Sequence, residues 1–183
     1  RCLAGLHDFK AERYEIPKPF GMVFQSSNLF AHLTLEDNIK LALIKTQKKS
    51  DREAQKICDQ VLDDVRLKNR SKSKPHQLSG GEQQRGTIAR TLALKPKVIF
   101  YDEPTSSLDP ELVDEVFDII LQLKQQNLIQ IIVSHETRVI KKISDSVGIM
   151  KQGELKWFGA ANELTNQLNQ MEQDEKKYLQ LFI

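Results

Sequence analysis

Two adjacent acids, Asp102 and Glu103, directly follow the apolar run "VIFY". A run of this kind predicts a strand that is covered on both faces, and α/β proteins bind their ligands where such strands end. One acid could hold Mg²⁺, which takes one or two carboxylates together with phosphate oxygens and water. The other could orient or deprotonate an attacking water molecule. The pair alone, however, is a common arrangement and does not identify a reaction.

The octapeptide "LSGGEQQR", which begins at Leu78, suggests that the ligand is an anion. Ser79 suits the N-cap of a helix, and Gly80 and Gly81 allow the backbone to approach a ligand closely. The unpaired N–H groups and the positive end of the helix dipole would then face that anion. An ordinary helix start explains "SGG" equally well, but the full octapeptide, placed shortly before Asp102, favours the anion site.

Two further polar residues close apolar runs. Gln25 ends the run that begins at Phe20, and His135 ends the run "IQIIVS". Each residue alone is more often structural, but together with the acid pair and the octapeptide they indicate a nucleotide site. The 183 residues contain no phosphate-binding loop of the form G-x-x-x-x-G-K-[ST], so one half of such a site is missing from them.

The pattern of apolar residues predicts the elements that position these side chains. Strands are expected at Phe20 to Gln25, at Val98 to Tyr101 and at "IQIIVSH", and two more around the turn at Gly153. The alternation of strand and helix after residue 97 predicts a parallel α/β sheet with helical crossovers.

Capping residues predict where the helices begin. Thr34, Ser50 (or Asp51) and Ser79 precede three helical patterns, and Pro110 suits the first position of a long amphipathic helix. The stretch from Ala160 to Ile183 is expected to be helical and polar, with an apolar end.

Composition limits the possible functions. A chain of 183 residues with 39% apolar content fits one domain with one core. The net charge of +2 and the scattered basic residues argue against a nucleic-acid partner. No apolar run approaches the roughly 20 residues that a membrane span requires. Cys2 and Cys58 are far apart, and we expect both to be free thiols.

In their order and spacing, these motifs resemble those of the ATPase subunit of an ABC (ATP-binding cassette) transporter. Gln25 matches the Q-loop, "LSGGEQ" the signature, "VIFYDE" the Walker B motif, "SSLD" the D-loop and His135 the switch histidine. The match covers Gly21 to about Gly159. Within the family, "GMVFQSSNLFAHLTLEDNI" and "DEPTSSLDPELV" are similar to bacterial importers of polar amino acids.

The resemblance implies an α/β fold of the P-loop NTPase (RecA-like) type, with a parallel-sheet core and an inserted α-helical subdomain. Residues 1–183 would be a single ABC ATPase domain with an incomplete N-terminal part, the helical subdomain would span about 27–85, and 160–183 would be a helical tail. The Walker A loop and the adenine-stacking aromatic would precede Arg1. We also expect residues 7–19 to join pieces across a gap. Taken literally, such a chain could not hold the β- and γ-phosphates and would be inactive.

The resemblance also assigns roles, in which two cassettes face each other head to tail around ATP. Asp102 would hold Mg²⁺, Glu103 would be the general base and Gln25 would contact both Mg²⁺ and the attacking water. His135 would contact the γ-phosphate. The D-loop acid Asp109 would pair across the dimer. The ATP of the partner chain would be bound by the signature residues Ser79, Gly80, Gly81 and Glu82.

The implied partners are a second ATPase subunit, most simply a homodimer, transmembrane permease subunits and, indirectly, a solute-binding protein, at the cytoplasmic face of the membrane. The apolar residues Leu29, Phe30 and Leu33 are candidates for the permease contact, or else form a packed loop. Two alternatives are a soluble ABC ATPase of DNA repair or translation and a regulatory cassette that does not hydrolyse ATP. The short interval between Gln25 and Ser79 argues against the repair proteins, which carry a long coiled coil there.

Overall fold

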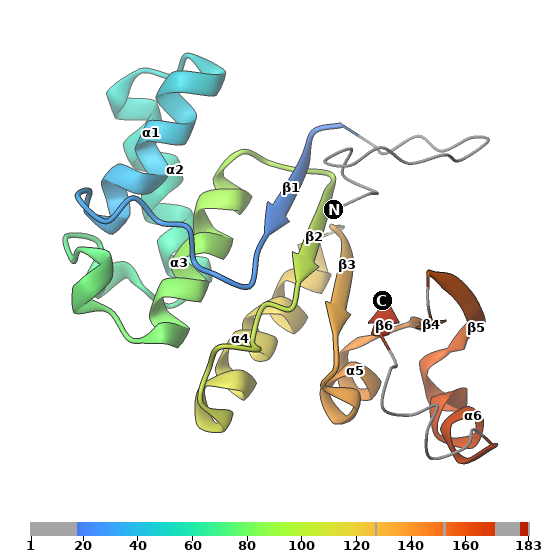
Figure 1. Cartoon of the computed structure of the whole chain (residues 1–183). Helices are drawn as coiled ribbons and strands as arrows, with labels where there is room; N and C mark the ends of the chain where they lie inside the picture. Colours follow the sequence, from blue (N-terminus) through green and yellow to red (C-terminus); the bar gives the residue numbers. More distant parts are fainter. Residues whose placement is uncertain (1–17, 127, 152, 171–179, 183) are drawn as a thin grey trace.

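A six-stranded sheet in the order β1-β2-β3-β6-β4-β5 forms the centre of the fold (Figure 1). The computed structural model describes residues 18–126, 128–151, 153–170 and 180–182. Because helices pack against this sheet (Figure 1), the fold is α/β, as the sequence predicts. Within these residues the strands are β1 (Phe20–Val23), β2 (Val98–Asp102), β3 (Ile129–Ser134), β4 (Ser146–Lys151), β5 (Glu154–Ala160) and β6 (Gln180–Phe182).

The first three strands are parallel neighbours. Val23 of β1 pairs with Tyr101 of β2, and Asp102 of β2 pairs with Val133 of β3. The central strand β2 is buried from Val98 to Tyr101, in agreement with its continuous apolar run. Because the three strands run in one direction, their carboxyl ends meet at a single edge of the sheet (Figure 1).

The remaining strands are antiparallel, so the prediction of a parallel sheet is wrong for this part. β4 pairs with both β5 and β6, and β6 pairs with β3 at Val133 and Ser134. A tight turn at Gly153, whose φ is +83°, joins β4 to β5. Such a turn can only connect antiparallel strands, since a parallel pair needs a long crossover.

The C-terminal stretch is helical only in part. A 3-10 turn at Ala161–Glu163 leads into α6 (Leu164–Gln170), whereas Gln180–Phe182 forms strand β6. The prediction of a helix throughout is therefore wrong at the apolar end, where β6 satisfies its backbone groups by pairing with β3 and β4. Residues 7–17 of the expected gap, and Cys2, lie outside the described residues.

The predicted caps begin the first three helices. Thr34 accepts a hydrogen bond from Asp37 N, and Ser50 and Ser79 each form a reciprocal capping box with a glutamate three residues later. The helices are α1 (Leu35–Gln47), α2 (Asp51–Asp64), α3 (Gly80–Ala93), α4 (Pro110–Leu123), α5 (Thr137–Ile143) and α6. None of the described helices is long and apolar enough to cross a membrane.

Helix α3 lies between the helices α1 and α2 and the sheet, and all of them share one core (Figure 1). Cys58 of α2 is a free, fully buried thiol in this core, and burial raises its pKa to about 12. Its predicted free state is thus confirmed, and the thiol is chemically inert. The contact between α3 and β1 is close because Gly21 leaves room for Thr91.

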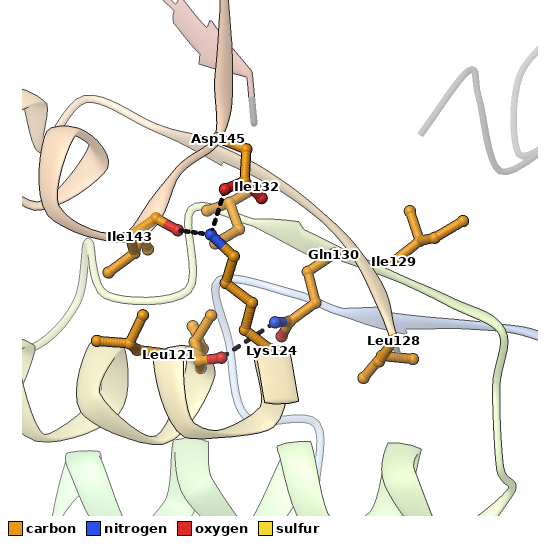
Figure 2. Close-up of a pocket in the computed structure, with 9 residues that line it drawn as sticks. Leu121, Lys124, Leu128, Ile129, Gln130, Ile132, Ile143 and Asp145 are labelled. Carbon is orange, nitrogen blue, oxygen red and sulfur yellow. Dashed lines mark hydrogen bonds and ion pairs between the residues drawn. The ribbon is translucent and has the colours of Figure 1, made fainter. Parts of the chain in front are cut away.

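A pocket lies beside the starting half of β3, away from the strand end that carries His135 (Figure 2). In it, Lys124 donates to Asp145 Oδ1 over 2.6 Å, and the amide of Gln130 donates to Ile120 O over 3.0 Å. The polar side chains of this pocket therefore serve to join α4 to its neighbours.

We expect Gly21→Ala to destabilise the fold by about 1–3 kcal/mol, because overpacking in a closed core costs this much. A methyl group at Gly21 would lie 2.2 Å from Thr91 Cγ2. Urea denaturation measures the loss. In a Thr91→Ala background the cost of Gly21→Ala should be much smaller, and an equal cost in both backgrounds would contradict the proposed clash.

Candidate functional site

The pairing of β2 with β3 brings Glu103 and His135 together. Each is the first residue beyond the carboxyl end of its strand, and Glu103 N donates to Val133 O over 2.9 Å, which extends the pairing past Asp102. His135 Nε2 lies 2.9 Å from Glu103 Oε1. Two residues that are 32 positions apart in the chain thus lie within hydrogen-bond distance of each other, a contact that the sequence analysis did not predict.

The backbone and the burial of Glu103 are both unusual for a glutamate. Its φ is +49°, in the left-handed region that non-glycine residues rarely adopt. Its side chain is only 19% exposed, and burial raises the pKa of the carboxyl, although the charge of His135 acts in the opposite direction. A carboxylate with a raised pKa holds a proton more readily, which suits a general base. Strained backbone at such a position is typical of a functional site.

Gln25 lies two residues beyond the end of β1, so the prediction that the strand runs to Gln25 is wrong. The amide of Gln84 in α3 donates to Phe24 O over 2.9 Å, at the point where the chain leaves the sheet. Ser107 Oγ then donates to Gln25 O over 3.3 Å. The exposed side chain of Gln25 is therefore held near the loop that follows Glu103.

Gln84 and Ser107 are positioning residues that the sequence reasoning missed. Gln84 is 2% exposed, in the apolar interior of the fold. Buried polar side chains need hydrogen-bond partners, so a glutamine on the inner face of a predicted helix was the signal that could have found it. Ser107 carries no comparable signal.

The signature residues begin helix α3. Ser79 Oγ accepts from Glu82 N over 3.1 Å, and Ser79 N donates to Glu82 Oε2 over 2.8 Å. Arg70 Nε donates to the other carboxylate oxygen of Glu82 over 3.0 Å. Burial alone would raise the pKa of Glu82, but the bonds from Ser79 and Arg70 outweigh it and lower that pKa. Glu82 therefore stabilises the start of the helix, and the capping box leaves the N–H groups of Gly80 and Gly81 to face an anion.

The two glycines of the signature face Leu108, in the loop before helix α4, and Leu112 of α4 itself, both in the same chain. A Cβ on Gly80 would lie 2.9 Å from Leu108 Cδ2, and one on Gly81 would lie 3.3 Å from Leu112 Cβ. The sequence predicts that these glycines allow close approach of a ligand, and the structure shows that they also allow close packing on Leu108 and Leu112. Asp109, the exposed N-cap of α4, makes no capping hydrogen bond with its side chain and lies next to Leu108.

The donor set at the strand ends fits Mg²⁺ in the form that the ion takes with nucleotides. Among the described residues, no three His, Cys, Asp or Glu side chains gather as a metal cage. Asp102 presents a partly buried carboxylate at the end of β2, and Gln25 offers an amide oxygen. One carboxylate with few other protein ligands is what Mg²⁺ accepts when phosphate oxygens and water complete its shell.

Comparison with known proteins identifies the family to which the chain belongs. The family model described as "ABC transporter" matches residues 4–106, more than half of the chain. The chain belongs to the ABC transporter family. The resemblance drawn from the motifs is confirmed, and so is the expected P-loop NTPase type of fold, since solved structures that share it are ABC cassettes.

Curated relatives within this family include amino-acid transport proteins. The "Glutamate transport ATP-binding protein GluA" of Corynebacterium glutamicum is 47% identical over 133 residues, which are 73% of this chain and 55% of that protein. The "Arginine transport ATP-binding protein ArtP" of Haemophilus influenzae is 40% identical over 83% of this chain and 63% of that protein. The chain thus spans little more than half the length of the curated relatives it matches.

Solved structures of ABC proteins have the same fold. One is the "Dimeric structure of a post-hydrolysis state of the ATP-binding cassette MJ0796 bound to ADP and Pi", which is 32% identical with a TM-score of 0.67 and covers 78% of this chain and 62% of that one. Another is cbiO1 from Clostridium perfringens, "Part of the ABC transporter complex cbiONQ", which is 27% identical with a TM-score of 0.75 and covers 81% of this chain and 60% of that one.

We expect Glu103→Gln to raise Tm by a few degrees at about pH 8 and to lose this gain by about pH 4. Because burial raises the pKa of Glu103, an ionised carboxylate destabilises the folded protein only above the ordinary glutamate value. Below that value both states are protonated and the cost vanishes. Thermal melts across this range measure the effect, and repeating them in a His135→Gln background removes any contribution of the imidazole. A gain that is the same at every pH would contradict this account.

Proposed function

We propose that this chain is part of an ATP-hydrolysing subunit of an ABC transporter, which couples ATP binding and hydrolysis at a head-to-tail dimer interface to the import of a solute, with polar amino acids as the solute class. The observation that carries this proposal is the pair formed by Glu103 and His135 at the ends of two adjacent parallel strands. The names of the relatives support transport over DNA repair, translation or a purely regulatory role.

In the proposed reaction, Glu103 accepts a proton from the water that attacks the γ-phosphate. Its buried carboxylate and raised pKa favour this role, and His135 holds one of its oxygens at 2.9 Å while its own exposed ring is able to contact the phosphate. Asp102 and Gln25 would hold Mg²⁺, which neutralises charge on the phosphate oxygens when bound. Binding of the β- and γ-phosphates also requires a phosphate-binding loop, so activity is expected only of a protein that supplies one.

The other half of each site would come from a second copy. Ser79 and Gly80 are exposed at the start of α3, and Asp109 is exposed at the start of α4. The N-terminus of α3 offers N–H groups and a positive dipole end to a triphosphate held by the partner. The dimeric form of the MJ0796 cassette, bound to ADP and Pi, supports an assembly of this kind.

We place the permease contact in the helical subdomain, over about residues 27–85, and the subunit at the cytoplasmic face of the membrane. Of the three apolar residues predicted for this contact, only Phe30 is well exposed, at 47%, while Leu29 packs against the core and Leu33 is partly buried. Arg90 lies 5.9 Å from the centroid of the Phe30 ring and supports its outward position. The description of cbiO1 as part of a transporter complex supports a membrane partner.

The full-length protein should hydrolyse ATP in the presence of Mg²⁺, and Glu103→Gln should lower kcat about 10²- to 10⁴-fold, because general-base catalysis contributes this much. A coupled assay of phosphate release measures the rate. The matched control is Glu154→Gln, which removes an exposed carboxyl on β5 and should leave kcat unchanged. Full activity in Glu103→Gln would exclude Glu103 as the base.

Ser79 and Ser50 offer a test of the signature that separates function from helix stability. Both residues form capping boxes, so replacing either with Ala should cost about 1 kcal/mol of stability. Only Ser79→Ala should also lower kcat and weaken ATP-dependent dimerisation, as measured by light scattering. Equal kcat values for the two variants would mean that Ser79 acts only as a helix cap.

A further inference from the structure

Helices α3 and α4 meet along a seam that begins at the two glycines of the signature. Gly80 faces Leu108 and Gly81 faces Leu112, and a larger residue at Gly80 would have to displace the end of the Leu108 side chain. The starts of the two helices are therefore fixed against each other. These starts carry Ser79 and Asp109, the residues through which this chain is proposed to reach its partner.

An ion pair closes the same seam further along. Arg85 lies four residues after Gly81 on α3, and its Nη1 pairs with the carboxylate of Glu115, which lies three residues after Leu112 on α4. Residues spaced by three or four positions share one face of a helix, so the glycine contacts and the ion pair belong to one stripe on each helix.

The two partners of the ion pair differ in how deeply they are buried. The side chain of Arg85 is 12% exposed, whereas that of Glu115 is 52% exposed. The Nε atom of Arg85 is buried and has no hydrogen-bond partner among the described residues. Glu115 is therefore the anchor of a guanidinium that is otherwise largely cut off from water, and a buried charge of this kind strongly resists separation from its partner.

The glycine packing and the ion pair together define the position of α3 against α4 more closely than either contact does alone. The glycine–leucine packing sets how closely α3 approaches Leu108 and Leu112, but a contact at the start of the helix alone leaves the orientation of this end relative to α4 less closely defined. The ion pair, about one turn further along, restricts that orientation. The orientation of α3 decides where the N–H groups of Gly80 and Gly81 point, because these groups project from the helix start.

We propose that Arg85 is a positioning residue, which through Glu115 holds the signature at a set orientation relative to Asp109, so that both reach the partner's nucleotide as one unit. This inference rests on the proposed function, since it assigns to the seam the alignment of a site completed by a second copy. Arg85 itself touches no nucleotide in this account and acts through α3.

The test uses Glu115→Gln in the full-length protein, because glutamine keeps the size of the side chain and a carbonyl oxygen that can still accept from Arg85, and a thermal melt measures how much of the variant is folded at the assay temperature. We expect kcat for ATP to fall about tenfold, as small misplacements remote from the chemistry can cost this much or more, while the subunit's own affinity for a fluorescent ATP analogue changes by less than about twofold. Arg85→Lys keeps the charge but loses the planar guanidinium, so its kcat should lie between those of the wild type and Glu115→Gln.

Asp118→Asn is the matched control, because it breaks another ion pair of α4, the one with Lys142, which lies on α5 rather than α3. This variant should keep the wild-type kcat. A wild-type kcat in Glu115→Gln, or a loss of kcat that merely follows the fraction of unfolded protein at the assay temperature, would overturn the proposal.

A second readout does not depend on ATP hydrolysis. In the nucleotide-free subunit, Glu115→Gln should shift the amide ¹H–¹⁵N resonances of Gly80 and Gly81, and Asp118→Asn should not. Unmoved glycine resonances would overturn the proposed positioning even if kcat fell. If the wild-type protein showed no ATPase activity while the resonances moved as expected, the proposed function would fail and the positioning of the signature by Arg85 would stand.

Discussion

The parallel pairing of β1, β2 and β3 is the constraint on which the rest of the molecule depends. It forces three chain segments, which are separated by more than 100 positions in total, to end at one edge of the sheet. The pairing of Asp102 with Val133 alone determines that Glu103 and His135 meet. A shift of this register by one residue would turn every side chain of β3 to the opposite face and separate the pair.

Helix α3 connects the sheet to the other helices by close packing, and small residues make these contacts possible. Thr91 packs against Gly21 of β1, Gly86 faces Leu35 of α1, and the signature glycines face α4 and the residue before its N-cap. Interiors are packed as densely as organic crystals, so each of these contacts resists displacement. The helix that begins with the signature is thus held on three sides, and any movement of the signature must involve the sheet or α4.

Some features follow from neighbouring residues and were predictable for that reason. A helix begins where a side chain satisfies the first N–H groups, so Thr34, Ser50 and Ser79 marked α1, α2 and α3 correctly. The errors occurred where a distant segment decides the outcome. β1 ends at Val23, and the carbonyl of the next residue, Phe24, accepts a hydrogen bond from Gln84, 60 positions away. The end of the chain is a strand at Gln180–Phe182 because β3 and β4 offer it pairing partners.

By itself the sequence determined the family, the types of the chemical groups and the approximate place of each element, because motif spacing and apolar periodicity are properties of neighbouring residues. Only the tertiary structure decided that β6 pairs with β3 and β4, that Glu103 has a strained backbone and a raised pKa, and that the signature glycines pack on Leu108 and Leu112. Burial, pairing and close packing arise between segments that are remote in the chain, and no local pattern specifies which segments will meet.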